Sequence, residues 1–195
     1  MTGPLVGAVL VLLASTSLGA EQLFNRVSMK PFKSGGFSME YPDGGGWRQT
    51  PAGGSAGDLL MLLTKQPDIR VFVRRTKLVQ PISQSAGDEV LTIFAQYEGE
   101  AVKENSPEAS NVRSTMVTHP SLGRVVRIDY TQPAMATTNP GVRERVQQFS
   151  VPAGEVLYRI IFSGSPKEFE KEVGRFNAML DSVRIASPAG QDQHP

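Results

Sequence analysis

Apolar and polar residues alternate along six segments of the chain, and a seventh segment is continuously apolar. Alternation with a period of two predicts a strand with one buried face, and a short continuous run predicts a strand covered on both faces. Short turns separate neighbouring segments, among them Pro152–Gly154, so we expect hairpins and a mainly antiparallel sheet. The predicted strands are 37–41, the continuous run 59–64, 69–78, 112–118, 124–131, 142–151 and 156–162.

The period changes to that of a helix after the third of these segments and continues to about Glu104. Ser85 and Asp88 have the spacing of a capping box, which predicts where this helix begins. Glu98 and the neighbouring carboxylates are expected on its solvent-facing side. The residues expected to face the core recur at helical spacing: Val90, Leu91, Phe94, Tyr97 and Ala101.

A second helix is predicted close to the C-terminus. Ser165 is expected as its N-cap, with Pro166 at the first helical position and Glu168 completing a capping box. One apolar stripe is expected to face the sheet: Phe169, Val173, Phe176, Leu180 and Val183.

This order of elements predicts an α+β domain over residues 36–186, with a mainly antiparallel sheet of about six to seven strands flanked by helices. Residues 21–35 are polar and irregular, and we interpret them as a lead-in arm. Residues 187–195 are expected to form a disordered tail.

The N-terminus has the features of a targeting signal. Leu5–Ala14 is an apolar run of the length found in signal peptides, and small residues follow it up to Ala20. We therefore expect residues 1–20 to be a cleaved signal and the mature protein to be exported, to the periplasm or beyond the cell. No Lys or Arg precedes the run, so an uncleaved membrane anchor is the alternative.

Composition excludes several kinds of site. The formal net charge is +1, from 20 basic and 19 acidic residues, so the chain lacks the broad positive field of a nucleic-acid-binding protein. The absence of cysteine excludes disulfides, thiolate nucleophiles and cysteine metal ligands. We predict no metal site and no cofactor.

Two segments carry a family resemblance. The opening FSMEYPDGGGW (Phe37–Trp47) and the late RVQQFSVPAGEVLYRIIFSGSPKEFEKEVGRFNAMLDSVRI (Arg145–Ile185) resemble the PsbP-like superfamily. That group includes the extrinsic photosystem II subunit PsbP, bacterial relatives of unknown function and a Ran-binding nuclear import factor of the same fold. The resemblance covers about residues 36–185 and implies an α/β/α sandwich. It also implies a docking or assembly role, because neither segment is a catalytic motif.

Candidate catalytic residues lie in unfavourable contexts. Ser55 lies in a G-x-S-x-G sequence, Gly53–Gly57, but that motif needs a strand-to-helix turn, and here Pro51 precedes it and a strand follows. We interpret it as a flexible loop. His119 precedes Pro120 and is expected to be a solvent-exposed turn residue. A serine hydrolase that uses Ser55 and His119 is kept as an alternative, but no catalytic residue is predicted.

Arginine side chains are the strongest candidates for binding. If the register places several of them on one face of the sheet, they form a basic patch for a carboxylate-rich partner or a phosphate. The alternative is cross-strand pairing with Asp129 and Glu144, or stems that cover apolar surface. The arginines on predicted strands are Arg70, Arg74, Arg127, Arg143, Arg145 and Arg159.

Trp47, the single tryptophan, is either a core residue or an exposed anchor for a partner. Taken together, these features favour an exported, non-enzymatic interaction or assembly module of the cell envelope that binds a protein partner. The alternative is a carrier of a small ligand or ion, with a pocket near Trp47 and Tyr41.

Overall fold

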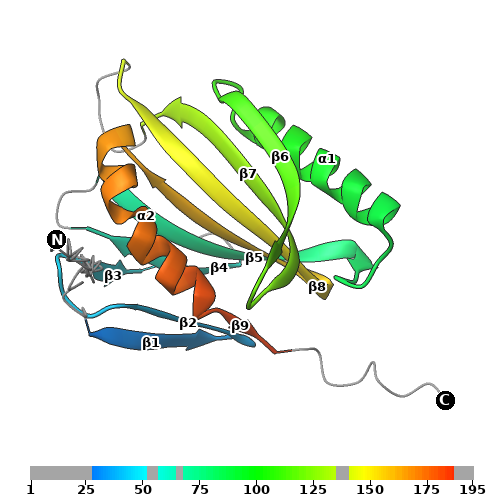
Figure 1. Ribbon diagram of the computed structural model, residues 1–195, viewed down its shortest axis with the longest axis horizontal. Helices are drawn as coiled ribbons and strands as arrows, with labels where there is room; N and C mark the ends of the chain where they lie inside the picture. The colour runs from blue at the N-terminus through cyan, green and yellow to red at the C-terminus, as the bar shows by residue number, and fades with distance from the viewer. Residues whose placement is uncertain (1–27, 52–56, 65–67, 135–140, 187–195) are drawn as a thin grey trace, which may run out of the picture.

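The computed structural model describes residues 28–51, 57–64, 68–134 and 141–186. The predicted signal peptide, Ser55 and the predicted tail lie outside the described residues. Figure 1 shows a twisted antiparallel sheet with helix α1 (Asp88–Asn105) on one face. Helix α2 (Pro166–Asp181) and a smaller sheet lie on the other face. The predicted α+β class, a mainly antiparallel sheet flanked by helices, is confirmed.

The larger sheet has the strand order β3-β4-β5-β8-β7-β6, and every neighbouring pair is antiparallel. The smaller sheet has the order β1-β2-β9. In chain order the strands are β1 (Met29–Ser34), β2 (Phe37–Pro42), β3 (Arg48–Thr50), β4 (Asp58–Leu63), β5 (Ile69–Ile82), β6 (Ser110–His119), β7 (Gly123–Pro133), β8 (Arg143–Gly164) and β9 (Arg184–Ile185).

The long element β8 lies at the centre of the larger sheet. Its first part, 143–150, pairs with β7, and its last part, 154–164, pairs with β5. Its ribbon runs along β7 and doubles back along β5 (Figure 1). Gly154 has a φ of 66°, a left-handed value that suits a tight turn. This agrees with the turn predicted at Pro152–Gly154.

Helix α2 covers the core on its side of the sheet. Phe162 of β8 packs between Phe169 and Phe176 of the helix, with ring centroids 4.5 Å from each. The predicted apolar stripe is confirmed, and so are the N-cap position of Ser165 and the place of Pro166. The capping box is wrong in its detail, because the Ser165 side chain makes no capping hydrogen bond. The Ser165 carbonyl accepts the first backbone hydrogen bond of the helix, from the N–H of Phe169 at 2.8 Å, as expected at an N-cap.

Helix α1 begins two residues later than the capping box at Ser85 predicts. Its N-cap is Gly87, and the Ser85 hydroxyl lies 2.7 Å from that of Ser83 instead. The predicted core stripe is correct at Leu91 and Phe94. It is wrong at Val90 and Tyr97, whose exposed fractions are 48% and 66%.

The close approach of α1 to β6 accounts for this rotation. Gly99 faces β6, and a Cβ on it would lie 3.0 Å from the Cβ of Ser114. The Ser114 hydroxyl donates to the Ala95 carbonyl at 2.6 Å. The flank of α1 that carries Ala95 and Gly99 therefore lies against β6, which turns Val90 and Tyr97 towards solvent.

Three strands are not predicted by the sequence pattern: β1, β3 and the two-residue β9. The expectation of an irregular arm is wrong for Met29–Ser34, which forms β1 and pairs with β2 along its whole length. The short strand β3 lies in the glycine-rich stretch 42–57, where the sequence pattern predicts a loop. The expectation that 59–64 is covered on both faces is also wrong: Leu60 and Leu62 are buried, whereas Met61 on the other face is only half-buried.

The aromatic contacts between α2 and β8 generate a stability prediction. Phe176→Ala removes a fully buried ring that stacks on Phe162, so we expect a loss of about 3 to 5 kcal/mol in the free energy of unfolding. Urea denaturation followed by circular dichroism measures it. Asn177→Ala, at the neighbouring exposed position, should change the free energy by less than about 0.5 kcal/mol. Equal losses in both variants would contradict this packing.

Candidate functional site

A groove of about 810 Å³ lies between α1 and the half of the larger sheet that α1 does not cover. Helix α1 packs chiefly on β6 and β7, so β4, β5 and the last part of β8 are open on this face. The floor of the groove includes the apolar side chains Met61, Phe72 and Ile161. Glu98, Ala101 and Asn105 of α1 form one wall.

Three arginines line the groove: Arg70 and Arg74 from β5, and Arg159 from β8. Arg74 and Arg159 are directly opposite one another in the strand register. The Arg74 guanidinium lies over the Phe72 ring, 5.3 Å from its centroid. The groove therefore combines an apolar floor with cationic side chains that converge on it.

The remaining predicted arginines lie elsewhere. Arg145 is on the α2 face, where it pairs with Glu170 and lies over the Phe169 ring at 4.5 Å. Arg127 lies between Val126 and Ile128 on β7, and these two residues face α1. Arg127 therefore points to the opposite face of the sheet. Arg143 lies at the end of the sheet, where its guanidinium donates to the Ser110 hydroxyl and to the carbonyls of Glu108 and Thr131. The six arginines on predicted strands thus do not form one patch.

Each groove arginine has a carboxylate partner: Arg70 pairs with Glu144, Arg74 with Asp58 and Arg159 with Glu98. The three carboxylate side chains are at most 4% exposed, whereas the arginine side chains are 16 to 43% exposed. The groove therefore presents guanidinium N–H groups to solvent above buried counterions. The alternative of pairing with Asp129 and Glu144 is also observed, since Arg127 binds Asp129 at 2.8 Å.

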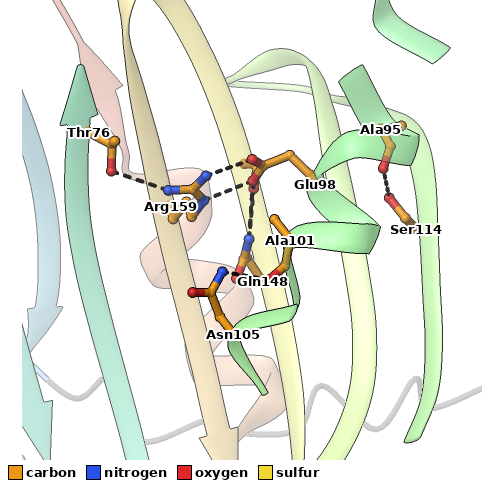
Figure 2. A network of polar contacts seen from close by, with 9 residues as sticks. Thr76, Ala95, Glu98, Ala101, Asn105, Ser114, Gln148 and Arg159 are labelled. Atoms are coloured by element: carbon orange, nitrogen blue, oxygen red, sulfur yellow. Dashed lines mark hydrogen bonds and ion pairs between the residues drawn. The ribbon is translucent and has the colours of Figure 1, made fainter. Parts of the chain in front are cut away.

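Glu98 is the main residue that the sequence interpretation missed. Its side chain has no exposed surface, so the expectation of a solvent-facing position is wrong. Figure 2 shows its carboxylate pointing from α1 to Arg159, whose Nη2 and Nε donate to it at 2.6 and 2.8 Å. The Ser150 hydroxyl donates at 2.6 Å and the Gln148 amide at 3.4 Å. The spacing of Glu98 from buried residues on the same helix was the available signal: Leu91, Phe94 and Val102.

Glu144 is buried beside two residues that line the groove, Arg70 and Gln132. It accepts hydrogen bonds from Arg70 and from the Gln132 amide, the latter at 2.6 Å. Burial opposes ionisation of the nearby Tyr130 phenol, and the negative charge of Glu144 opposes it further. These two effects raise the pKa of Tyr130 to about 12.

The other candidate residues are structural. Trp47 is 5% exposed and belongs to the core. Of the two alternatives for Trp47, a core residue or an exposed anchor, the structure shows the core residue. The expectation of a solvent-exposed His119 is wrong, since its side chain is 13% exposed. Its Nδ1 lies 3.1 Å from the Ser121 hydroxyl, and its Nε2 lies 3.3 Å from Asp181 at the end of α2. His119 thus joins the β6–β7 turn to α2.

Within the described ranges, no group of three or more metal-ligating side chains could hold a metal ion. Among the same residues, no helix is both long and apolar enough to cross a membrane.

No family model and no curated protein matches the chain. Among solved structures, it is similar to the cyanobacterial PsbP (CyanoP) of Synechocystis, with a TM-score of 0.52 and 14% identity over 86% of this chain and 98% of that one. It is also similar to LpqN of Mycobacterium tuberculosis, which is described as involved in cell envelope biogenesis. That match has a TM-score of 0.53 and 13% identity over 83% of this chain and 92% of that one. The chain has a PsbP-like fold.

The burial of Glu98 generates a prediction about stability. Glu98→Leu leaves Arg159 without its counterion, so we expect a loss of about 3 to 5 kcal/mol in the free energy of unfolding. The double variant Glu98→Leu/Arg159→Leu should regain a large part of that loss, because no unpaired charge remains. Urea denaturation of both variants measures the difference.

Glu100→Leu provides the matched control on the same helix. Glu100 is 64% exposed and pairs with Lys103, so its loss should cost less than about 0.5 kcal/mol. A Glu98 variant no less stable than the Glu100 variant would contradict the buried pair.

Tyr130 generates a prediction about pH. The neutral phenol is favoured in the folded state, so its contribution to stability is complete below pH 10 and is lost as the pH rises through about 12. Tyr130→Phe should remove a tyrosinate step near pH 12 from the absorbance titration at 295 nm. Tyr97→Phe, at an exposed position, should leave this step in place. A Tyr130 variant with an unchanged high-pH step would contradict the assignment.

Proposed function

We propose that this protein is an accessory module of the cell envelope, and that it acts by binding a protein partner in the groove beside α1. The observation that supports this most strongly is the arrangement of Arg70, Arg74 and Arg159 around an apolar floor. Guanidinium groups pair well with carboxylates, and apolar surface beside them adds the burial that holds a partner.

Arg74 is the groove arginine with the most capacity for a new contact. Its side chain is 43% exposed, and its bond to Asp58 uses Nε. Among the described residues only Nε is bonded, so the two Nη groups can donate to a partner's carboxylate or carbonyl oxygens. Because Asp58 and the Phe72 ring already hold the guanidinium in place, a partner meets an ordered donor, and binding costs less side-chain entropy.

Binding rather than catalysis is favoured by the state of the groove carboxylates. Asp58, Glu98 and Glu144 are all engaged by arginine, and Glu98 accepts four hydrogen bonds. A general base needs a carboxylate that can reach a substrate proton, and these oxygens are turned to their counterions instead. Location in the envelope is supported by the apolar N-terminal run and, by analogy of fold, by LpqN.

In-cell crosslinking with the variant Arg70→Gln/Arg74→Gln tests this function. The matched control is Arg127→Gln/Arg145→Gln, which removes two paired arginines from other positions. We expect the groove variant to reduce capture of a specific protein at least about tenfold, because each charge-assisted bond contributes about 1.5 to 3 kcal/mol. The control should capture as much as the wild type.

Thermal melts of both variants establish that each is folded. Equal capture by the two variants, or no specific protein in any of them, would contradict the proposal. A small molecule that copurifies with the wild type and is lost from the groove variant, with no protein captured, would support the carrier alternative instead. Trp47 and Tyr41, the residues expected to line a carrier pocket, are 5% and 4% exposed and lie in the core.

A further inference from the structure

Helix α1 has apolar residues on two sides, and the described chain covers only one of them. Its buried side faces the sheet through Leu91, Phe94 and Val102. A second stripe of Val90, Ile93 and Tyr97 is 48 to 66% exposed. These residues are spaced three and four apart, so they form one continuous ridge along the helix surface. Apolar residues on two sides are typical of a helix that packs between two neighbours.

The exposed stripe continues into the groove. Tyr97 lies one turn before Ala101, and Ala101 lines the groove wall. Figure 2 shows Ala95 on the flank that contacts Ser114 of β6, and Ala101 and Asn105 on the flank towards Arg159. The stripe therefore borders the open half of the sheet and is turned away from β6.

We propose that the groove and the exposed stripe together receive an amphipathic helix of the partner protein, with acidic residues along one edge. This inference rests on the proposed function and specifies the kind of segment that binds. The partner helix lies beside α1 over β4, β5 and the last part of β8. Its apolar side contacts Phe72, Ile161 and the stripe.

The dimensions of the layer favour a helix. Helices pack about 8 to 10 Å apart, and neighbouring strands are about 4.8 Å apart, so helices in one layer lie roughly two strands apart. Because α1 lies over β6 and β7, the next helix position falls over the open strands. The ridge of Val90, Ile93 and Tyr97 has the spacing that interlocks with a facing helix.

The charge of the groove favours an acidic edge. Arg70 and Arg74 lie four residues apart on β5, on the same face, with their guanidinium groups exposed above buried carboxylates. Four strand residues span about 13 Å and two helix turns about 11 Å, so aspartate or glutamate residues two turns apart on the partner helix can reach both of them. A basic partner would instead place like charges against these guanidinium groups, which is unfavourable.

Photo-crosslinking from both sides of the groove tests this inference. A photo-reactive phenylalanine analogue replaces Phe72 in one variant and Tyr97 in another, and mass spectrometry of the full chain in intact cells maps the captured residues. We expect both positions to capture one segment of one partner, at residues spaced three, four or seven apart, with Asp or Glu within the same turns.

Capture of a second copy of this chain, of lipid alone, or of residues spaced by two along a strand would overturn the inference. Unlinked segments captured from the two positions would overturn it as well. The absence of capture from either position would also overturn it. In each of these cases the proposed function still stands if the in-cell crosslinking described above captures a protein and Arg70→Gln/Arg74→Gln reduces that capture. The two failures are therefore distinguishable.

Paired variants of α1 provide the second measurement. Ile93→Ser/Tyr97→Ser removes the ridge, and we expect it to reduce capture of the same partner at least about tenfold. Thr92→Ser/Gln96→Ser changes two exposed positions of the same helix outside the ridge and should leave capture unchanged. Ile93 and Tyr97 are both more than half exposed, so neither pair should lower the melting temperature. Equal capture by the two pairs would contradict the role of the ridge.

Discussion

The ion pair between Glu98 and Arg159 holds α1 in position on the larger sheet. The carboxylate has no exposed surface, and it depends on the guanidinium, Ser150 and Gln148 for its hydrogen bonds. A shift of the helix by one residue would leave a buried charge without partners, which is strongly unfavourable. On the opposite flank, Gly99 allows close contact with Ser114. The helix is therefore held over β6 and β7, and β4 and β5 are left open.

The chemistry of the groove follows from that position. Had α1 been centred on the sheet, it would have covered Phe72 and Arg74. Instead these side chains face a cavity in which each arginine is ordered by a buried carboxylate and still directs donors outwards. Such an arrangement is suited to recognition, because the cost of ordering the donors has been met within the fold. Helix α2 covers the other face with close aromatic packing.

Local patterns were sufficient for strands β4 to β8 of the larger sheet and for α2, whose stripe is regular and almost wholly buried. They were insufficient where a contact with a residue far along the chain determines whether a side chain is buried. Glu98 is buried because of Arg159, which lies 61 residues away. Val90 and Tyr97 have the spacing of core residues, but the contact of Gly99 with β6 turns them to solvent. The strand β1 has a weak pattern and forms because β2 pairs with it.

Hydroxyl-radical footprinting of the protein, alone and in the complex it forms in the cells that make it, is the most direct test that the groove is the binding face. The account predicts that Met61, Phe72 and Tyr97 lose reactivity in the complex. Met29 of β1, in the smaller sheet, should keep its reactivity. Protection of Met29 with unchanged reactivity at the three groove-side residues would show that the partner binds elsewhere and would contradict the account.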